Sequence, residues 1–193
     1  MTKGRLEAFS DGVIAILITI LVLELKVPHG ADLHALEPLL PVFLTYVLSF
    51  VYIGIYWNNH HHMLHATDRI NGGILWANQH LLFWLSLVPF TTGWMGENHF
   101  EPLPTAAYGV VLLMAAIAYT VLQKLIIRHQ GPDSKLGKAV GKDTKGLVSL
   151  ALYLVAIPGA FLNGWLALTC YIVVALIWLV PDRRIERHLH QQA

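Results

Sequence analysis

The sequence has 193 residues, of which 55% are hydrophobic and only 13% are charged. Because soluble domains average about 25% charged residues, this composition indicates a membrane protein. The net charge of +1 gives no reason to expect a nucleic-acid partner. A single cysteine, Cys170, excludes an internal disulfide and a thiolate metal site. We expect no cleavable signal peptide, because the first apolar run is too long and no small-residue cleavage site follows it.

Six apolar segments come near the length of about 20 residues that a helix needs to cross a hydrocarbon core of about 30 Å. Pro, Gly and Asn residues mark most of the breaks between them, and the histidines at 60–62 are taken to end the second segment. The sequence therefore predicts an all-α protein with a single six-helix transmembrane domain over residues 1–193. The predicted spans are residues 7–26, 36–57, 70–95, 104–128, 145–162 and 165–181.

The positive charges fall almost entirely on one side of these predicted spans. With six spans, both termini and the second and fourth loops share a side, and that side collects all but one of the 13 Lys and Arg residues. The exception is Lys26. Because Lys and Arg accumulate in cytoplasmic loops, we expect both termini in the cytoplasm. The polar segment 130–144 is then expected to be a solvated cytoplasmic connector.

The first apolar segment has two unlike faces when it is drawn as a helix with about 100° per residue. Asp11 falls roughly 140° from Ile16 on this wheel, near the opposite face. The face around Ile16 is an aliphatic stripe that a single hydroxyl interrupts, and it comprises Gly12, Ile16, Thr19, Ile20 and Leu23.

Asp11 is expected to have a partner. A carboxylate within a membrane helix costs about 2.5–3.5 kcal/mol at the centre on insertion scales, and less near the interface. Arg5 lies on the wrong side of the same helix to be that partner. Donors are therefore expected from the second and third spans, which offer Trp57, His60, His61 and Asn78. The alternative is that Asp11 merely caps the start of a helix.

The motif Arg5-x-x-x-Phe9-Ser10-Asp11-Gly12 runs directly into an Ile/Thr/Leu helix. It resembles the signature of the transmembrane protein 175 family, which comprises the lysosomal potassium channel of animals and its prokaryotic relatives. The resemblance extends through the third predicted span, at Trp57, His60, His61, Asn78 and residues 89–92. The last three spans match this family only in hydropathy and topology.

This resemblance implies a channel that favours K⁺ over Na⁺ and is not an enzyme. A single repeat of this kind would form a homotetramer in the inner membrane of a prokaryotic cell, with no cofactor beside the permeant K⁺. The first helix of each subunit would line a central pore. The family's tightest point corresponds to Ile16, its further apolar rings to Ile20 and Leu23, and its nearby threonine to Thr19. The helical wheel places the same four residues on one stripe.

The remaining motif residues are expected to hold the pore helix to its own subunit. Phe9, Ser10 and Asp11 would do so through the second and third spans, at Trp57, His60, His61 and Asn78. Arg5 belongs to the same motif, but the wheel places it with the stripe, so its role stays open.

The expected pore differs from a carbonyl-lined potassium filter. Since no T-V-G-Y-G sequence is present, a ring of backbone carbonyls is not expected. A ring of Ile16 side chains offers no ligands, so this hydrophobic constriction should gate by dewetting. Glu24 is expected to lie in a solvated mouth, with a weak cation-attracting ring as the alternative.

Other functions remain as alternatives. Asp11 and the histidines could serve a proton-linked secondary transporter or a proton-permeable leak, although broken helices and inverted repeats are not evident. The histidines at 60–62 could make gating depend on pH. Because adjacent residues of a helix point in different directions, they do not suggest a metal site. No set of residues suggests catalysis.

Overall fold

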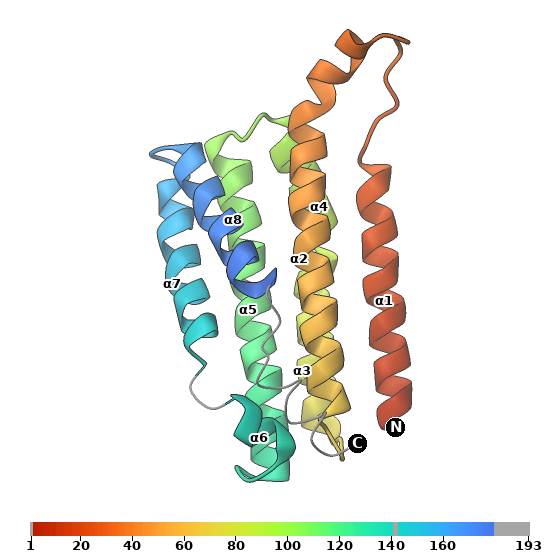
Figure 1. The fold of residues 1–193 in the computed structure, drawn as a ribbon, viewed down its shortest axis with the longest axis vertical. Coiled ribbons are helices and arrows are strands. Elements are labelled where there is room, and N and C mark those ends of the chain that lie inside the picture. Colours follow the sequence, from red (N-terminus) through yellow and green to blue (C-terminus); the bar gives the residue numbers. More distant parts are fainter. Residues whose placement is uncertain (1, 141–142, 180–193) are drawn as a thin grey trace.

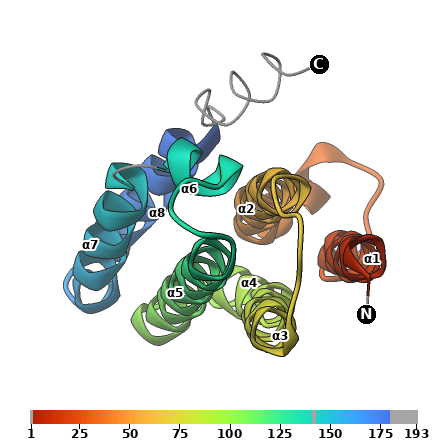
Figure 2. The same ribbon diagram turned by 90° about the horizontal axis from the view of Figure 1, so that it is seen from below.

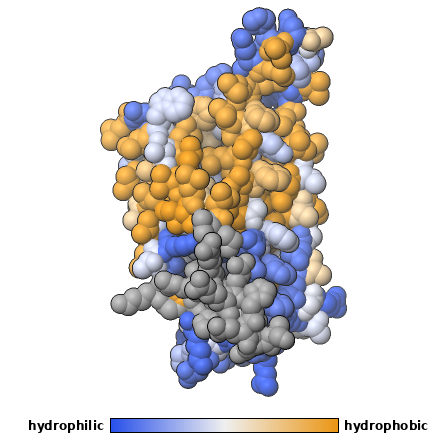
Figure 3. All heavy atoms as spheres, viewed as in Figure 1, coloured by the Kyte–Doolittle hydropathy of each residue, from blue (hydrophilic) through white to orange (hydrophobic). Residues whose placement is uncertain are grey.

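A computed structural model describes residues 2–140 and 143–179 of this chain. Within these ranges the regular structure is entirely helical, which confirms the predicted all-α class. Three helical stretches are long and apolar enough to cross a membrane, judged by length and composition: Lys3–Leu23, Leu33–His65 and Pro102–Gln130. The space-filling view shows a broad hydrophobic belt between two hydrophilic ends, as a membrane protein requires (Figure 3).

The first two long helices run in opposite directions. Helix α1 covers Lys3–Leu23, and a short 3-10 helix, η1 (Leu33–Leu39), leads into α2 (Leu40–His65) (Figure 1). Helix α2 continues through the histidines at 60–62, so the predicted break there is wrong. Histidine has an ordinary helix propensity and does not terminate a helix by itself.

The third predicted span consists of two helices. Helix α3 (Gly72–Ser86) is followed by α4 (Val88–Glu97) after a break at Leu87. Pro89 is the second residue of α4, where its missing N–H removes no helical hydrogen bond, whereas further inside a helix it would remove one. The break therefore lies at the position that the proline permits.

The second half of the chain contains one element that was not predicted. Helix α5 (Pro102–Gln130) ends before Gly131, whose positive φ of 92° suits glycine. Helix α6 (Lys135–Val140) lies in the segment expected to be a connector. It is stabilised at its start by the Ser134 hydroxyl, which accepts from Gly137 N. The chain then forms α7 (Thr144–Gly159) and α8 (Gly164–Leu179), which pack on one another.

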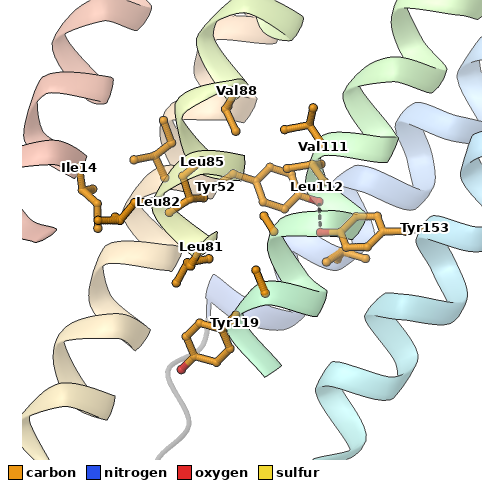
Figure 4. Close-up of a cluster of buried hydrophobic side chains, with 14 of the residues drawn as sticks. Ile14, Tyr52, Leu81, Leu82, Leu85, Val88, Val111, Leu112, Tyr119 and Tyr153 are labelled. Atoms are coloured by element: carbon orange, nitrogen blue, oxygen red, sulfur yellow. Dashed lines mark hydrogen bonds between the residues drawn. The ribbon is translucent and has the colours of Figure 1, made fainter. Parts of the chain in front are cut away.

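Helix α1 lies at one edge of the bundle (Figures 1 and 2). It contacts α2, α3 and α4, whereas α5 packs against α3, α4, α7 and α8. Buried tyrosines bind the central helices together: Tyr52 Oη donates to the carbonyl of Tyr171 at 2.6 Å, and Tyr153 Oη donates to Tyr52 Oη at 3.3 Å (Figure 4). The bundle therefore presents α1 on a packed support, with part of its surface uncovered.

Candidate functional site

One face of α1 packs against the rest of the chain. Its buried residues recur every three or four positions, which is the spacing of one helical face, and they are Leu6, Ser10, Ile14, Leu17 and Leu21. This face meets α2, α3 and α4. The spacing thus determines which side of α1 is turned toward its own bundle.

The opposite face of α1 is apolar and uncovered. Ile16 is 58% exposed and Leu23 is 77% exposed, whereas Ile14, only two positions from Ile16, is fully buried. Gly12, Thr19 and Ile20 are exposed as well. The Thr19 hydroxyl donates to the carbonyl of Ile16 at 2.7 Å, so this polar group is satisfied within the helix. Ile16, Thr19 and Leu23 therefore face away from the chain's own bundle, whereas Ile20, at 37% exposure, lies at the margin of the exposed face beside α4.

A buried hydrogen-bond network fastens the N-terminal half of α1. Asn78 Nδ2 of α3 donates to Ser10 Oγ at 2.9 Å, and Ser10 Oγ donates to the carbonyl of Leu6 at 2.8 Å. His60 Nε2 of α2 lies 2.7 Å from Asn78 Oδ1. Because the Asn78 oxygen can only accept, the Nε2–H of His60 donates. Ser10, His60 and Asn78 are all buried, so the network joins three helices out of reach of solvent.

Asp11 has a partner on α2. The Nε1–H of Trp57 donates to Asp11 Oδ1 at 3.1 Å. Of the four donors that the sequence offers, Trp57 therefore bonds Asp11, whereas Asn78 bonds Ser10 and His60 bonds Asn78. Because α1 already begins at Lys3, Asp11 lies well inside the helix, and the alternative that it caps a helix start is wrong.

His61 lies outside the buried network. It is exposed, and its ring stacks on Trp57 at a centroid distance of 6.0 Å and on His65 at 6.1 Å. Adjacent His60 is buried, which shows how neighbouring positions on α2 point in different directions. Among the described residues no group of three or more His, Cys, Asp or Glu side chains could hold a metal ion.

Two motif residues lie on the uncovered face of α1. Phe9 is 46% exposed and Arg5 is exposed, and neither takes part in the side-chain hydrogen bonds that join Ser10 and Asp11 to α3 and α2. The spacing explains their position, because Phe9 lies seven residues, or about two turns, before Ile16. The structure thus separates the motif into Ser10 and Asp11, which contact α2 and α3, and Arg5 and Phe9, which face outward.

Further contacts that the sequence did not reveal lie at the two ends of α1. Lys3 Nζ donates to the carbonyl of His65 at 2.9 Å. Beyond the other end, Lys26 Nζ donates to Glu97 Oε1 at the end of α4, and the hydrogen bond and charge of Glu97 raise the pKa of Lys26. Lys26 and Glu97 are far apart in the sequence, so no local pattern could have paired them.

Comparisons with known proteins cover almost the whole chain. Residues 5–89 match a family model described as the endosomal/lysosomal potassium channel TMEM175. A protein from Chryseobacterium sp. (strain P1-3), named a potassium channel, is 55% identical over 99% of this chain and 100% of its own length. Another protein of that name, from Chamaesiphon minutus, is 33% identical over 90% of this chain and 91% of its own length.

A solved structure supports the same relationship. The crystal structure of a lysosomal potassium-selective channel TMEM175 homolog from Chamaesiphon minutus superposes with a TM-score of 0.82 at 32% sequence identity. The match covers 93% of this chain and 97% of that one. A chicken protein named the endosomal/lysosomal proton channel TMEM175 is 44% identical, but over only 32% of this chain and 15% of its own length.

Proposed function

This chain belongs to the TMEM175 family of channels, and from that membership we propose that it conducts K⁺ in preference to Na⁺ through a pore lined by α1. The single observation that carries the proposal is the uncovered aliphatic stripe on α1, in a chain whose relatives are named potassium channels. A stripe of this kind needs either an apolar environment or a narrow one. A pore between identical helices supplies the narrow environment.

The proposed assembly is a homotetramer. Helix α1 lies at the edge of its own bundle, and its exposed face is free to meet the same face of other copies. A closed ring about a rotation axis would bring equivalent residues together at each level of the pore. Ile16, Ile20 and Leu23 would then form successive apolar rings.

The proposed constriction works by controlling water. A narrow ring of Ile16 side chains offers an ion no ligands, so it dewets when narrow and conducts when it widens. The stretch from Ile16 to Leu23 is about 10 Å long at 1.5 Å per residue, which makes a short bottleneck. K⁺ sheds its water more readily than Na⁺ does, and the Thr19 oxygen can replace part of that water. We therefore expect moderate selectivity.

The buried network and the Asp11–Trp57 hydrogen bond have a different proposed role, which is to orient α1. The bonds of Ser10 and Asp11 to α3 and α2 fix the rotation of the helix about its own axis. A rotation of about 100° corresponds to a shift by one residue and would remove Ile16 from the axis. These polar residues would thus hold the wall of the pore without touching the ion.

The proposed location is the inner membrane of a prokaryotic cell, with both termini in the cytoplasm. Basic residues gather at the end of the bundle where α1 begins: Lys3 and Arg5 lie in the first turn of α1, Arg69 precedes α3 and Arg128 lies in the last turn of α5. The positive-inside rule assigns this end to the cytoplasm.

The test is reconstitution into planar bilayers with opposing K⁺ and Na⁺ gradients, comparing wild type with Ile16→Asn. A polar ring wets more easily, so this variant should raise the conductance and move the reversal potential toward zero. Ala15→Asn is the matched control, because Ala15 is also exposed on α1 but lies roughly 100° away from Ile16. Unchanged currents in Ile16→Asn would remove Ile16 from the constriction.

A proton-permeable leak is the second candidate. It is favoured by the chicken relative that is named a proton channel, although that match covers a minor part of both chains. Asp11 and the histidines near it would carry the proton. A reversal potential that follows a pH gradient at symmetric K⁺ would support the leak, and one that follows only K⁺ would exclude it. Saturable, coupled flux would instead indicate a transporter.

A further inference from the structure

A groove lies between α1 and α4, at the end of the bundle where α1 ends. Its volume is about 500 Å³, with Ile20 of α1 and Glu24 directly after α1 on one side, and Pro89, Phe90 and Gly93 of α4 on the other. This volume falls within the range of about 300–1,000 Å³ that is typical of small-molecule sites. The groove lies more than two turns along α1 from Ser10, so it is distinct from the buried network.

The Glu24 carboxylate lies in this groove, and the charge of Lys26 acts on it without forming a salt bridge. A Cβ atom at Gly93 would stand 2.5 Å from Glu24 Oε2, so the glycine lets the Glu24 carboxylate lie directly against α4. Glu97 follows one turn later on α4 and pairs with Lys26. Among the described residues Glu24 makes no ion pair. Two carboxylates with one ammonium leave a net negative charge here, which favours a cationic occupant.

Aromatic rings line the groove beside this carboxylate. Phe90 and Trp94 lie with their centroids 6.0 Å apart at an interplanar angle of 30°, and Phe90 is 64% exposed. Aromatic faces attract cations and also bury apolar groups. Ile20 adds an aliphatic wall on the α1 side. An acyl chain alone would offer no charged group to the Glu24 carboxylate.

We propose that this groove binds a lipophilic amine, with its ammonium group on Glu24 and its apolar body against Phe90 and Ile20. Such a ligand would lie between α1 and α4 next to one of the residues assigned to the pore wall. It would therefore bias the position of the outer half of α1 and change the open probability. This effect on gating rests on the proposed channel function, whereas the binding itself does not.

Calorimetry on the purified, detergent-solubilised full chain tests the binding. The probe is phenethylamine, and 2-phenylethanol is its uncharged analogue of similar shape. Removing the charge from either side, by Glu24→Gln or by the alcohol, should weaken binding about tenfold, which corresponds to about 1.4 kcal/mol. Gly93→Ala should weaken it severalfold, because the new methyl group displaces the Glu24 carboxylate. Glu37→Gln is the matched control and should bind as wild type does, since Glu37 pairs with His34 on η1.

Three outcomes would overturn the proposal. Equal binding by wild type and Glu24→Gln would show that the carboxylate is not used. Equal binding of the amine and the alcohol would indicate a purely apolar groove, of the kind that lipid fills. Binding by dissociated monomers but not by the assembled protein would indicate that a second copy occupies the groove.

Bilayer currents separate this proposal from the channel function. Phenethylamine should change the open probability of wild type but not of Glu24→Gln. If wild type binds the amine in a Glu24-dependent manner yet carries no K⁺ current, the channel proposal fails and the site stands. If K⁺ currents are normal and Glu24→Gln binds the amine as wild type does, the site fails and the channel stands.

Discussion

The two ends of α1 are joined to the chain by contacts of different kinds. Toward its N-terminus, Ser10 bonds Asn78 in the fully buried network and Asp11 bonds Trp57. Beyond its C-terminus, Lys26 pairs with Glu97 on the surface, with 74% and 46% of the two side chains exposed. Leaving a buried polar group unsatisfied costs about 1–3 kcal/mol, whereas surface ion pairs are typically worth less than about 1 kcal/mol.

This difference indicates where α1 can move. The N-terminal half is expected to stay fixed against α2 and α3. The C-terminal half, which the packing of Leu17 and Leu21 and the surface ion pair hold, is expected to shift more easily. Ile20 and Leu23 lie in the C-terminal half, and Ile20 lines the groove beside α4. If the pore widens because the C-terminal half of α1 moves, the N-terminal half would still hold the helix in the same rotation about its own axis. Substitutions at three places test this comparison.

The largest effect is expected at Asn78. Asn78→Ala removes the acceptor of the buried His60 Nε2–H and the donor to Ser10, which keeps only its bond to the carbonyl of Leu6. We expect a loss of about 2–3 kcal/mol in the free energy of unfolding, measured by denaturant titration in micelles. Gln79→Ala on the exposed side of α3 is the control and should change stability by less than about 0.5 kcal/mol. Equal stability of the two variants would mean that the network does not fasten α1.

The next effect is expected at Asp11 and Trp57. Asp11→Ala and Trp57→Phe each remove the same hydrogen bond, so a double-mutant cycle should give a coupling energy of about 1 kcal/mol. Asp11→Ala should impair folding or assembly more than ion selectivity, because the carboxylate is turned away from the stripe. Normal assembly with altered selectivity would contradict the separation of the two faces of α1.

The smallest effect on stability is expected at Lys26. Its pKa is raised by Glu97, so the ion pair is fully present below the ordinary lysine value of about 10.4 and is lost as pH rises through the raised pKa. Because this ion pair is exposed and contributes little to stability, Lys26→Met should hardly change unfolding at neutral pH. It should abolish the part of the alkaline destabilisation that this pair causes. Lys26→Met should clearly alter the open probability of the channel, while its effect on the free energy of unfolding stays small. The reverse pattern would show that this end of α1 is not the mobile one.

Most of what the sequence predicts about the site follows from the helical periodicity of α1. Because burial in a helix follows the 3.6-residue repeat, the helical wheel alone separates Ile16 from Ser10. Phe9 lies two turns before Ile16 and is exposed as Ile16 is. The expectation that Phe9 contacts its own subunit came from the motif and not from the spacing.

Contacts between distant segments could not be predicted in the same way. The sequence offers four possible donors for Asp11, and the packing of α2 decides that Trp57 fills this role. The pairing of Lys26 with Glu97 depends on how α4 is placed after the break at Leu87. The groove depends on Gly93, whose small size matters only because Glu24 lies beside it.

Cysteine accessibility during conduction tests the central claim, that the uncovered face of α1 lines the pore. Single cysteines would be introduced at Ile16 and Leu23, and at the buried positions Leu17 and Leu21, in a Cys170→Ser background. A charged methanethiosulfonate reagent should block K⁺ current in Ile16→Cys and Leu23→Cys and leave Leu17→Cys and Leu21→Cys unaffected. Block at Leu17 and Leu21 without block at Ile16 and Leu23 would place the ion path on the other side of α1 and contradict the account.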